Sequence, residues 1–152
     1  IVDWDVHHGN GTQALVEDDP AIRFISMHQS PWYPGTGAAG DRGPHRSAWN
    51  VPLPGNLAPE VYVEALQAAV IDATGDFTPD LVMISAGFDA HRADPLAMRD
   101  LVEDDYGWVT ARLVELAQKH AKGHVVSVLE GGYDLTALAN SALAHLNALR
   151  ES

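Results

Sequence analysis

The feature that most constrains the fold is an alternation between short apolar segments and longer segments with a helical repeat. Residues 1–6, 22–28, 81–86 and 125–129 form the short segments, which are rich in β-branched side chains. Continuously apolar segments of this length are typical of parallel strands buried on both faces. Apolar residues at helical spacing form three stripes, in residues 61–70, 106–117 and 135–149. The alternation predicts an α/β domain with a mostly parallel sheet flanked by helices.

Composition narrows the classes of partner and site. Of the 152 residues, 46% are hydrophobic and 20% are charged, which is typical of a globular domain. The formal net charge of −12 would repel phosphate backbones, so we expect no direct nucleic-acid binding, whereas a cationic partner suits it. No apolar segment approaches membrane-spanning length, so no membrane partner is expected. There is no cysteine, so any metal must be held by His, Asp or Glu.

Polar side chains follow three of the predicted strands. The first segment ends in DWDVHHG (residues 3–9), residues 81–86 lead into GFDAH, and residues 125–129 lead into EGGYD. In open parallel sheets, ligands bind beyond the carboxyl ends of the strands. The sequence therefore predicts that these three motifs meet at one edge of the sheet and form a site there.

The first two motifs predict a metal site. Alternation along an extended chain would put Asp3, Asp5 and His7 on one side, and Asp89 would come from a neighbouring strand. Burying carboxylates side by side is costly unless a cation compensates their charge. Two carboxylates and an imidazole suit zinc, and three protein ligands leave room for water and substrate. A single Asp or His would more often be a helix cap or a core residue, but the combination favours a metal.

Tyr133 follows two glycines, Gly131 and Gly132, which permit positive φ angles and close approach of a ligand to the main chain. A phenol held there could donate a hydrogen bond to a developing oxyanion. Taken alone, the same pattern also fits an aromatic residue packed beside a turn.

Four segments together resemble the successive motifs of the histone deacetylase family, in the family's order. They are DWDVHHGNGTQ, HQSPWYPGTG, SAGFDAHRADPL and LEGGYDL, and the likeness runs from Ile1 to about Leu149. The chain is most similar to the class II branch, which includes bacterial histone deacetylase-like amidohydrolases and acetylpolyamine amidohydrolases. The resemblance implies an arginase/deacetylase-like fold and a zinc-dependent hydrolase that removes acetyl groups from acetyl-lysine peptides or acetylpolyamines. It also implies a cytoplasmic, bacterial setting.

The resemblance assigns roles residue by residue. It implies that Asp5, His7 and Asp89 bind one zinc ion, and that Tyr133 polarises the scissile carbonyl and stabilises the oxyanion. It also implies a structural potassium site and the orientation of a catalytic histidine by Asp3, Ser26, Met27 and Asn10. The resemblance further implies that the acyl-lysine tunnel and its rim are lined by Tyr33, Leu96, Gly131 and Gly132.

Part of the family's machinery has no counterpart in this chain. Members carry a tandem histidine pair, acting as general base and acid, before the motif that contains the first zinc ligands. His7 and His8 are not that pair, because His7 matches a zinc ligand. We therefore expect residues 1–152 to be the C-terminal part of a single catalytic domain, with a sheet incomplete at its N-terminal side and little activity by itself.

Two other functions fit parts of the sequence. A ureohydrolase of the arginase type has a related fold, and Asp89-Ala90-His91 superficially resembles its motifs, but that chemistry needs two manganese ions and more bridging carboxylates. A metal-binding or interaction module without catalysis would fit if the histidine pair were absent from the parent protein.

Overall fold

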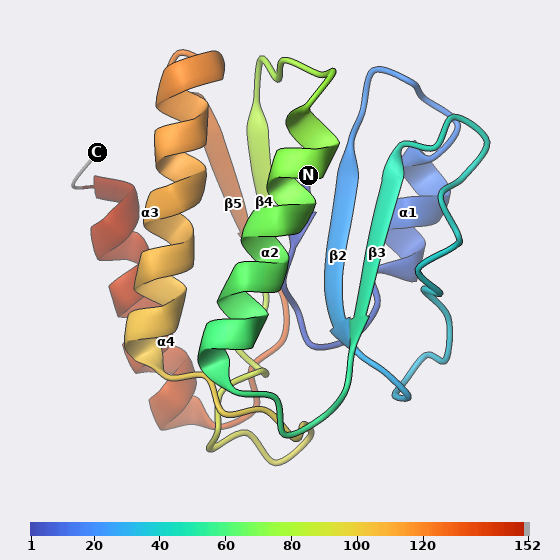
Figure 1. The fold of residues 1–152 in the computed structure, drawn as a ribbon. Coiled ribbons are helices and arrows are strands. Elements are labelled where there is room, and N and C mark those ends of the chain that lie inside the picture. The colour runs from blue at the N-terminus through green and yellow to red at the C-terminus, as the bar shows by residue number, and fades with distance from the viewer. Residues whose placement is uncertain (151–152) are drawn as a thin grey trace.

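The computed structural model describes residues 1–150, which form a five-stranded parallel sheet with the order β3-β2-β1-β4-β5. This confirms the predicted fold class. The strands are β1 (Val2–Asp3), β2 (Phe24–Gln29), β3 (Ala48–Leu53), β4 (Val82–Ala86) and β5 (Val125–Leu129). The carboxyl ends of β2 and β3 point to the bottom of the view in Figure 1.

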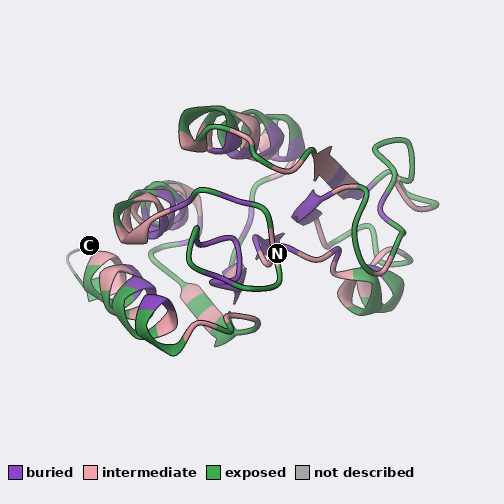
Figure 2. Cartoon of the chain, turned by 90° about the horizontal axis from the view of Figure 1, so that it is seen from below, coloured by how far each residue is buried: buried purple, intermediate pink, exposed green. Residues whose placement is uncertain are grey.

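Four helices accompany the sheet: α1 (Asn10–Val16), α2 (Pro59–Thr74), α3 (Glu103–His120) and α4 (Leu135–Arg150). Figure 1 shows α2 and α3 on one face of the sheet, α4 beside α3, and α1 on the other face. The three long helices coincide with the three apolar stripes of the sequence. In Figure 2 the buried residues of these helices lie on the side that faces the interior, and the side that faces outward is exposed. None of the helices within residues 1–150 is long and apolar enough to cross a membrane.

The order of the strands reverses around β1. The chain runs from β1 through β2 to β3 on one side, and then returns to place β4 on the other side of β1. Val2 is thus in register with Ile25 of β2 and with Ile84 of β4. In parallel sheets, such a reversal opens a crevice at the carboxyl ends of the two central strands. The polar motifs that follow β1 and β4 therefore emerge beside each other.

Three details of the predicted strands are wrong. The edge strand β3 was not predicted, because Asn50 and Pro52 interrupt its apolar pattern; a proline is tolerated at a sheet edge, where its missing N–H is not needed. The first strand ends at Asp3 rather than at residue 6. The last strand, β5, is at the opposite edge and is not buried on both faces, since Val126 and Val128 are 44% and 49% exposed.

Candidate metal centre

The segment after β1 is shaped by its own aspartates. Asp3 accepts a hydrogen bond from the main-chain N–H of Asp5 at 3.0 Å, and Asp5 accepts one from the N–H of His7 at 2.8 Å. Each carboxylate thus closes a turn over the residue two positions ahead, as Asp side chains commonly do. The expectation of an extended strand with Asp3, Asp5 and His7 alternating along it is therefore wrong. The turns, not a pleat, bring Asp5 and His7 to the crevice.

Asp89 comes from the segment after β4 and is fully buried. Its Oδ1 accepts a hydrogen bond from the main-chain N–H of Val6 at 2.8 Å, which fixes the carboxylate against the segment that carries Asp5 and His7. Its Oδ2 has no well-aligned donor among the described residues, although Nδ1 of His7 lies 3.2 Å away. A buried carboxylate oxygen left this way is costly unless a cation occupies the space before it.

Asp5, His7 and Asp89 form the one group in residues 1–150 whose ligand atoms could share a metal ion. One atom of each lies within 4.8 Å of the others, and Nδ1 of His7 is 2.9 Å from Oδ1 of Asp5. The main chain of Gly131 closes the group from β5, with its N–H donating to Oδ2 of Asp5 at 2.9 Å. A Cβ on Gly131 would lie 2.6 Å from that oxygen and closer still to Oδ2 of Asp89. The residues predicted as ligands are thus brought together in a cradle that leaves no room for a side chain at Gly131.

The electrostatics of the group fit a cation. Burial, followed by repulsion from Asp89, raises the pKa of the Asp5 carboxyl above its ordinary value. Burial and the neighbouring Asp5 raise the pKa of Asp3 to about 8. The contact with Asp89, followed by that with Asp5, raises the pKa of His7 to about 9. These raised pKa values reflect carboxylates crowded together in a buried place, and the donor set of two carboxylates and one imidazole fits a divalent metal.

A cavity of about 520 Å³ opens in front of these ligands. It is lined by the predicted site residues Asp3, Asp5, His7, Tyr33, Gly131, Gly132 and Tyr133, together with His8, Gly9, Gly11, Thr12, Leu129 and Glu130. The ring of Tyr33 lies edge-on to that of His7, with centroids 6.1 Å apart. Burial and the nearby Asp89 and Asp5 raise the pKa of Tyr133 above its ordinary value, so its hydroxyl keeps its proton at neutral pH.

Of the residues predicted for the potassium site, the tunnel rim and the orientation of a histidine, Asp3 alone lines this cavity. Asp3 is in register with Ser26, whose Oγ is hydrogen-bonded to Nδ1 of His28 at 3.0 Å. Met27 is fully buried in β2 beside Ser26. Asn10 is exposed at the start of α1, and neither Asn10 nor Leu96 lines the cavity. Leu96 instead accepts a hydrogen bond through its carbonyl from Nε1 of Trp32 at 3.0 Å.

Two buried residues near the cavity were not assigned a role from the sequence. His8 is hydrogen-bonded through Nδ1 to Thr36 at 2.8 Å and through Nε2 to Gln13 at 2.9 Å. Asp94 accepts a hydrogen bond from the main-chain N–H of Tyr133 at 2.8 Å. Tyr133 lies 39 residues further along the chain, so the position of Asp94 within HRADPL was the only available signal.

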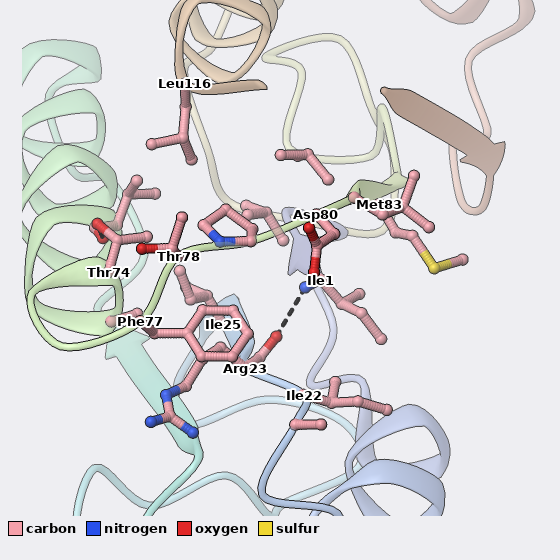
Figure 3. A pocket seen from close by; sticks show the side chains of 17 residues that line it. Ile1, Ile22, Arg23, Ile25, Thr74, Phe77, Thr78, Asp80, Met83 and Leu116 are labelled. Atoms are coloured by element: carbon pink, nitrogen blue, oxygen red, sulfur yellow. Dashed lines mark hydrogen bonds between the residues drawn. The ribbon is translucent and has the colours of Figure 1, made fainter. Parts of the chain in front are cut away.

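A second cavity of about 440 Å³ lies at the opposite, amino-terminal edge of the strands (Figure 3). Its lining is mainly aliphatic and aromatic, with Arg23 and Asp80 as its charged residues. The amino group of Ile1 donates to the carbonyl of Arg23 there at 2.7 Å. This cavity lacks the ligand set found at the carboxyl ends of the strands, so the chemistry of the chain is concentrated at the other edge.

Comparisons with known proteins identify what the chain is similar to. A family model described as "Histone deacetylase domain" matches residues 1–149. Histone deacetylase 15 of Arabidopsis thaliana is 42% identical over 156 residues, covering 98% of this chain and 28% of that protein. A histone deacetylase-like amidohydrolase of Pseudomonas aeruginosa is 41% identical over 137 residues, covering 88% and 36%.

A solved structure also resembles this chain. The crystal structure of an acetylpolyamine aminohydrolase from Burkholderia pseudomallei matches with a TM-score of 0.86 and 26% identity, over 97% of this chain and 43% of that one. The chain spans less than half the length of the curated relatives that it matches. Because the family model covers almost all of the sequence, the chain belongs to the histone deacetylase domain family.

Proposed function

We propose that the protein carrying this chain is a zinc-dependent deacetylase that hydrolyses the amide of an acetylated amine. The observation that carries the proposal is the convergence of Asp5, His7 and Asp89 beside a cavity that Asp5, His7 and Tyr133 line. Membership of the histone deacetylase domain family supports a deacetylase-type reaction.

One zinc ion would be held by Oδ1 or Oδ2 of the two aspartates and by Nδ1 of His7. Zinc bound there would supply Lewis-acid polarisation of the substrate carbonyl. The protein's part is to fix the two carboxylates. The N–H of Val6 holds Oδ1 of Asp89, and the N–H groups of His7 and Gly131 hold the two oxygens of Asp5. Such anchoring of ligands tunes both their orientation and their basicity.

Tyr133 supplies the hydrogen bond to the reacting carbonyl oxygen in this proposal. Its hydroxyl is protonated at neutral pH, since burial and neighbouring acids raise its pKa. A donor that meets the oxygen as negative charge develops on it stabilises the transition state more than the ground state. Tyr33, with its ring beside His7, forms one wall for the acyl chain, and the main chain at Gly131 and Gly132 forms another side.

Asp3, Ser26 and Met27 are proposed to surround a potassium ion behind the zinc ligands. Support comes from Asp3, whose burial raises its pKa to about 8, so a cation beside it would keep the carboxylate ionised. A Cβ on Gly9 would overlap Oδ2 of Asp3, so a glycine is needed for the main chain to pack against this carboxylate. We assign Asn10 to the orientation of a catalytic histidine and Leu96 to the tunnel rim. In this proposal the chain is the C-terminal part of a catalytic domain. The general base belongs to a part of that domain outside residues 1–152.

The substrate class is an acetyl-lysine peptide or an acetylated polyamine. Both carry an amide on a flexible chain, and both usually carry further positive charge. The formal net charge of −12 favours the approach of such cationic molecules.

The test uses the full-length protein and the variant Asp89→Asn, which preserves the volume of the buried side chain. We expect zinc content, measured by mass spectrometry, to fall below one tenth of the wild-type value. Hydrolysis of an acetyl-lysine reporter and of acetylspermidine should fall at least about 100-fold, because a ligand and a buried charge are lost together. Asp18→Asn removes the same charge from an exposed position and should change neither quantity.

Full zinc content and activity in Asp89→Asn would overturn the ligand assignment. Two manganese ions per chain together with hydrolysis of a guanidinium substrate would replace the proposal by a ureohydrolase of the arginase type. Zinc binding without hydrolysis of any acetylated amine by the full-length protein would leave a metal-binding module.

A further inference from the structure

Asp94 lies in the connection between β4 and α3, and it is buried, with 7% of its surface exposed. Both oxygens of its carboxylate are used. Oδ2 accepts the main-chain N–H of Tyr133 at 2.8 Å, and Oδ1 accepts the N–H of Leu96 at 2.9 Å. The residue therefore joins the segment after β4 to the segment after β5 at the mouth of the cavity.

The two hydrogen bonds have different origins. The bond to Leu96 spans two residues and closes a local turn, as Asp side chains often do. The bond to Tyr133 spans 39 residues and connects two segments that the sheet topology brings together. A local turn needs only one acceptor oxygen, and burial of a carboxylate is costly. The second oxygen thus has its use in holding Tyr133.

The main chain around Tyr133 needs such a support. Gly132, which precedes it, has a φ of +139°, in a region that side chains rarely adopt. The Tyr133 side chain is 50% exposed, so packing alone does not fix its direction. At Gly131 the segment is held by the N–H, which donates to the metal-ligand candidate Asp5 at 2.9 Å, and by the carbonyl, which accepts the N–H of Phe88 at 2.8 Å. At Tyr133 itself the main-chain N–H is held by Asp94.

The same carboxylate reaches a third segment through Leu96. The carbonyl of Leu96 accepts the indole N–H of Trp32 at 3.0 Å, and Trp32 directly precedes Tyr33, whose ring lies beside His7. Charge-assisted hydrogen bonds to main-chain N–H groups are among the stronger ones in proteins. Asp94 is thus the point at which the segments carrying Tyr133, Leu96 and Tyr33 are tied together.

We propose that Asp94 is a positioning residue, whose carboxylate fixes the main chain of Tyr133 so that the phenol reaches the reacting carbonyl over the metal ligands. The inference rests on the role proposed above for Tyr133. Asp94 touches no substrate; it acts through Tyr133, so its removal should weaken transition-state stabilisation while metal binding persists.

The first experiment measures hydrogen exchange at the Tyr133 amide in the full-length protein. Asp94→Ala removes both acceptor oxygens, and we expect exchange at this amide to become at least tenfold faster. The matched control is Asp134→Ala, next to Tyr133, whose carboxylate caps α4 by accepting the N–H of Ala137 at 2.8 Å. The control loses a helix cap and some thermal stability, but its Tyr133 amide should exchange at the wild-type rate.

The second experiment is a double-mutant cycle of Asp94→Ala with Tyr133→Phe, followed through kcat, KM and zinc content. We expect Asp94→Ala to lower kcat at least tenfold with unchanged zinc content. In the Tyr133→Phe background the same change should alter kcat by less than twofold, because the group being positioned is already missing. A merely structural role would lower kcat by equal factors in both backgrounds, and that result would overturn the proposal.

Two other results also count against the proposal. Unchanged kcat in Asp94→Ala despite faster amide exchange would separate the hydrogen bond from function. Unchanged kcat in Tyr133→Phe, or no hydrolysis by the wild type, would instead remove the proposed function and the inference with it. If Asp94→Ala does not fold, Asp94→Asn preserves the side-chain volume yet offers one acceptor oxygen for two donors, and it enters the same cycle.

Discussion

Gly131→Ala should disrupt the metal site by adding one methyl group. The new Cβ would lie 2.6 Å from Oδ2 of Asp5, whereas ordinary contact begins at 3.4 Å, so the carboxylate or the main chain must move by roughly 0.8 Å. Metal–ligand distances tolerate about 0.2 Å. The required shift exceeds that tolerance about fourfold, and Asp89 is crowded as well. We expect zinc affinity to fall at least about 100-fold, or about 2.7 kcal/mol.

Isothermal titration of the metal-free full-length protein with zinc measures this change. Gly11→Ala is the matched control, since Gly11 lines the same cavity but a Cβ there meets nothing within 4 Å. It lies inside α1, so alanine should leave zinc affinity unchanged and slightly stabilise the helix. Wild-type zinc affinity in Gly131→Ala would refute the geometry of the site.

Two further predictions concern pH. The contacts of His7 with Asp89 and Asp5 raise its pKa to about 9. Zinc must displace that proton, so calorimetric affinity should rise about tenfold per pH unit from about pH 6.5 to 8.5, and a flat profile would exclude His7 as a ligand. Burial lowers the pKa of His145 from 6.5 to about 4. Between these two pH values the imidazole is protonated in the unfolded chain but neutral in the folded chain, so the free energy of unfolding decreases as the pH falls. Urea unfolding should show about 2 kcal/mol less stability at about pH 4.5 than at about pH 7 from this group, and His145→Gln should abolish that part; equal pH dependence in both proteins would contradict it.

The sequence predicted most of the elements and the candidate ligands from features that are encoded locally. Three amphipathic stripes became α2, α3 and α4, since apolar residues at helical spacing form a helix that buries one side. Asp5, His7 and Asp89 could be named because they directly follow apolar strand segments, and the carboxyl ends of parallel strands meet at one edge.

The same local pattern gave wrong details where contacts with other parts of the chain determine the main-chain conformation. Asn50 and Pro52 interrupt the apolar pattern of β3, so its sequence does not predict a strand. The strand forms because its main chain pairs with β2, not because its residues have a high β propensity. Extended alternation was predicted for Asp3 to His7, but side-chain hydrogen bonds to the main chain shaped turns there instead.

Along the chain, then, the sequence determines an α/β domain of the histone deacetylase family and names the residues of one candidate metal site. Only the tertiary structure decides how that site is held. The N–H of Val6 meets Asp89, the N–H of Gly131 meets Asp5, and the N–H of Tyr133 meets Asp94. Each bond joins residues between 39 and 126 positions apart. No local periodicity encodes such pairs, because they arise only when sheet order places the ends of β1, β4 and β5 side by side.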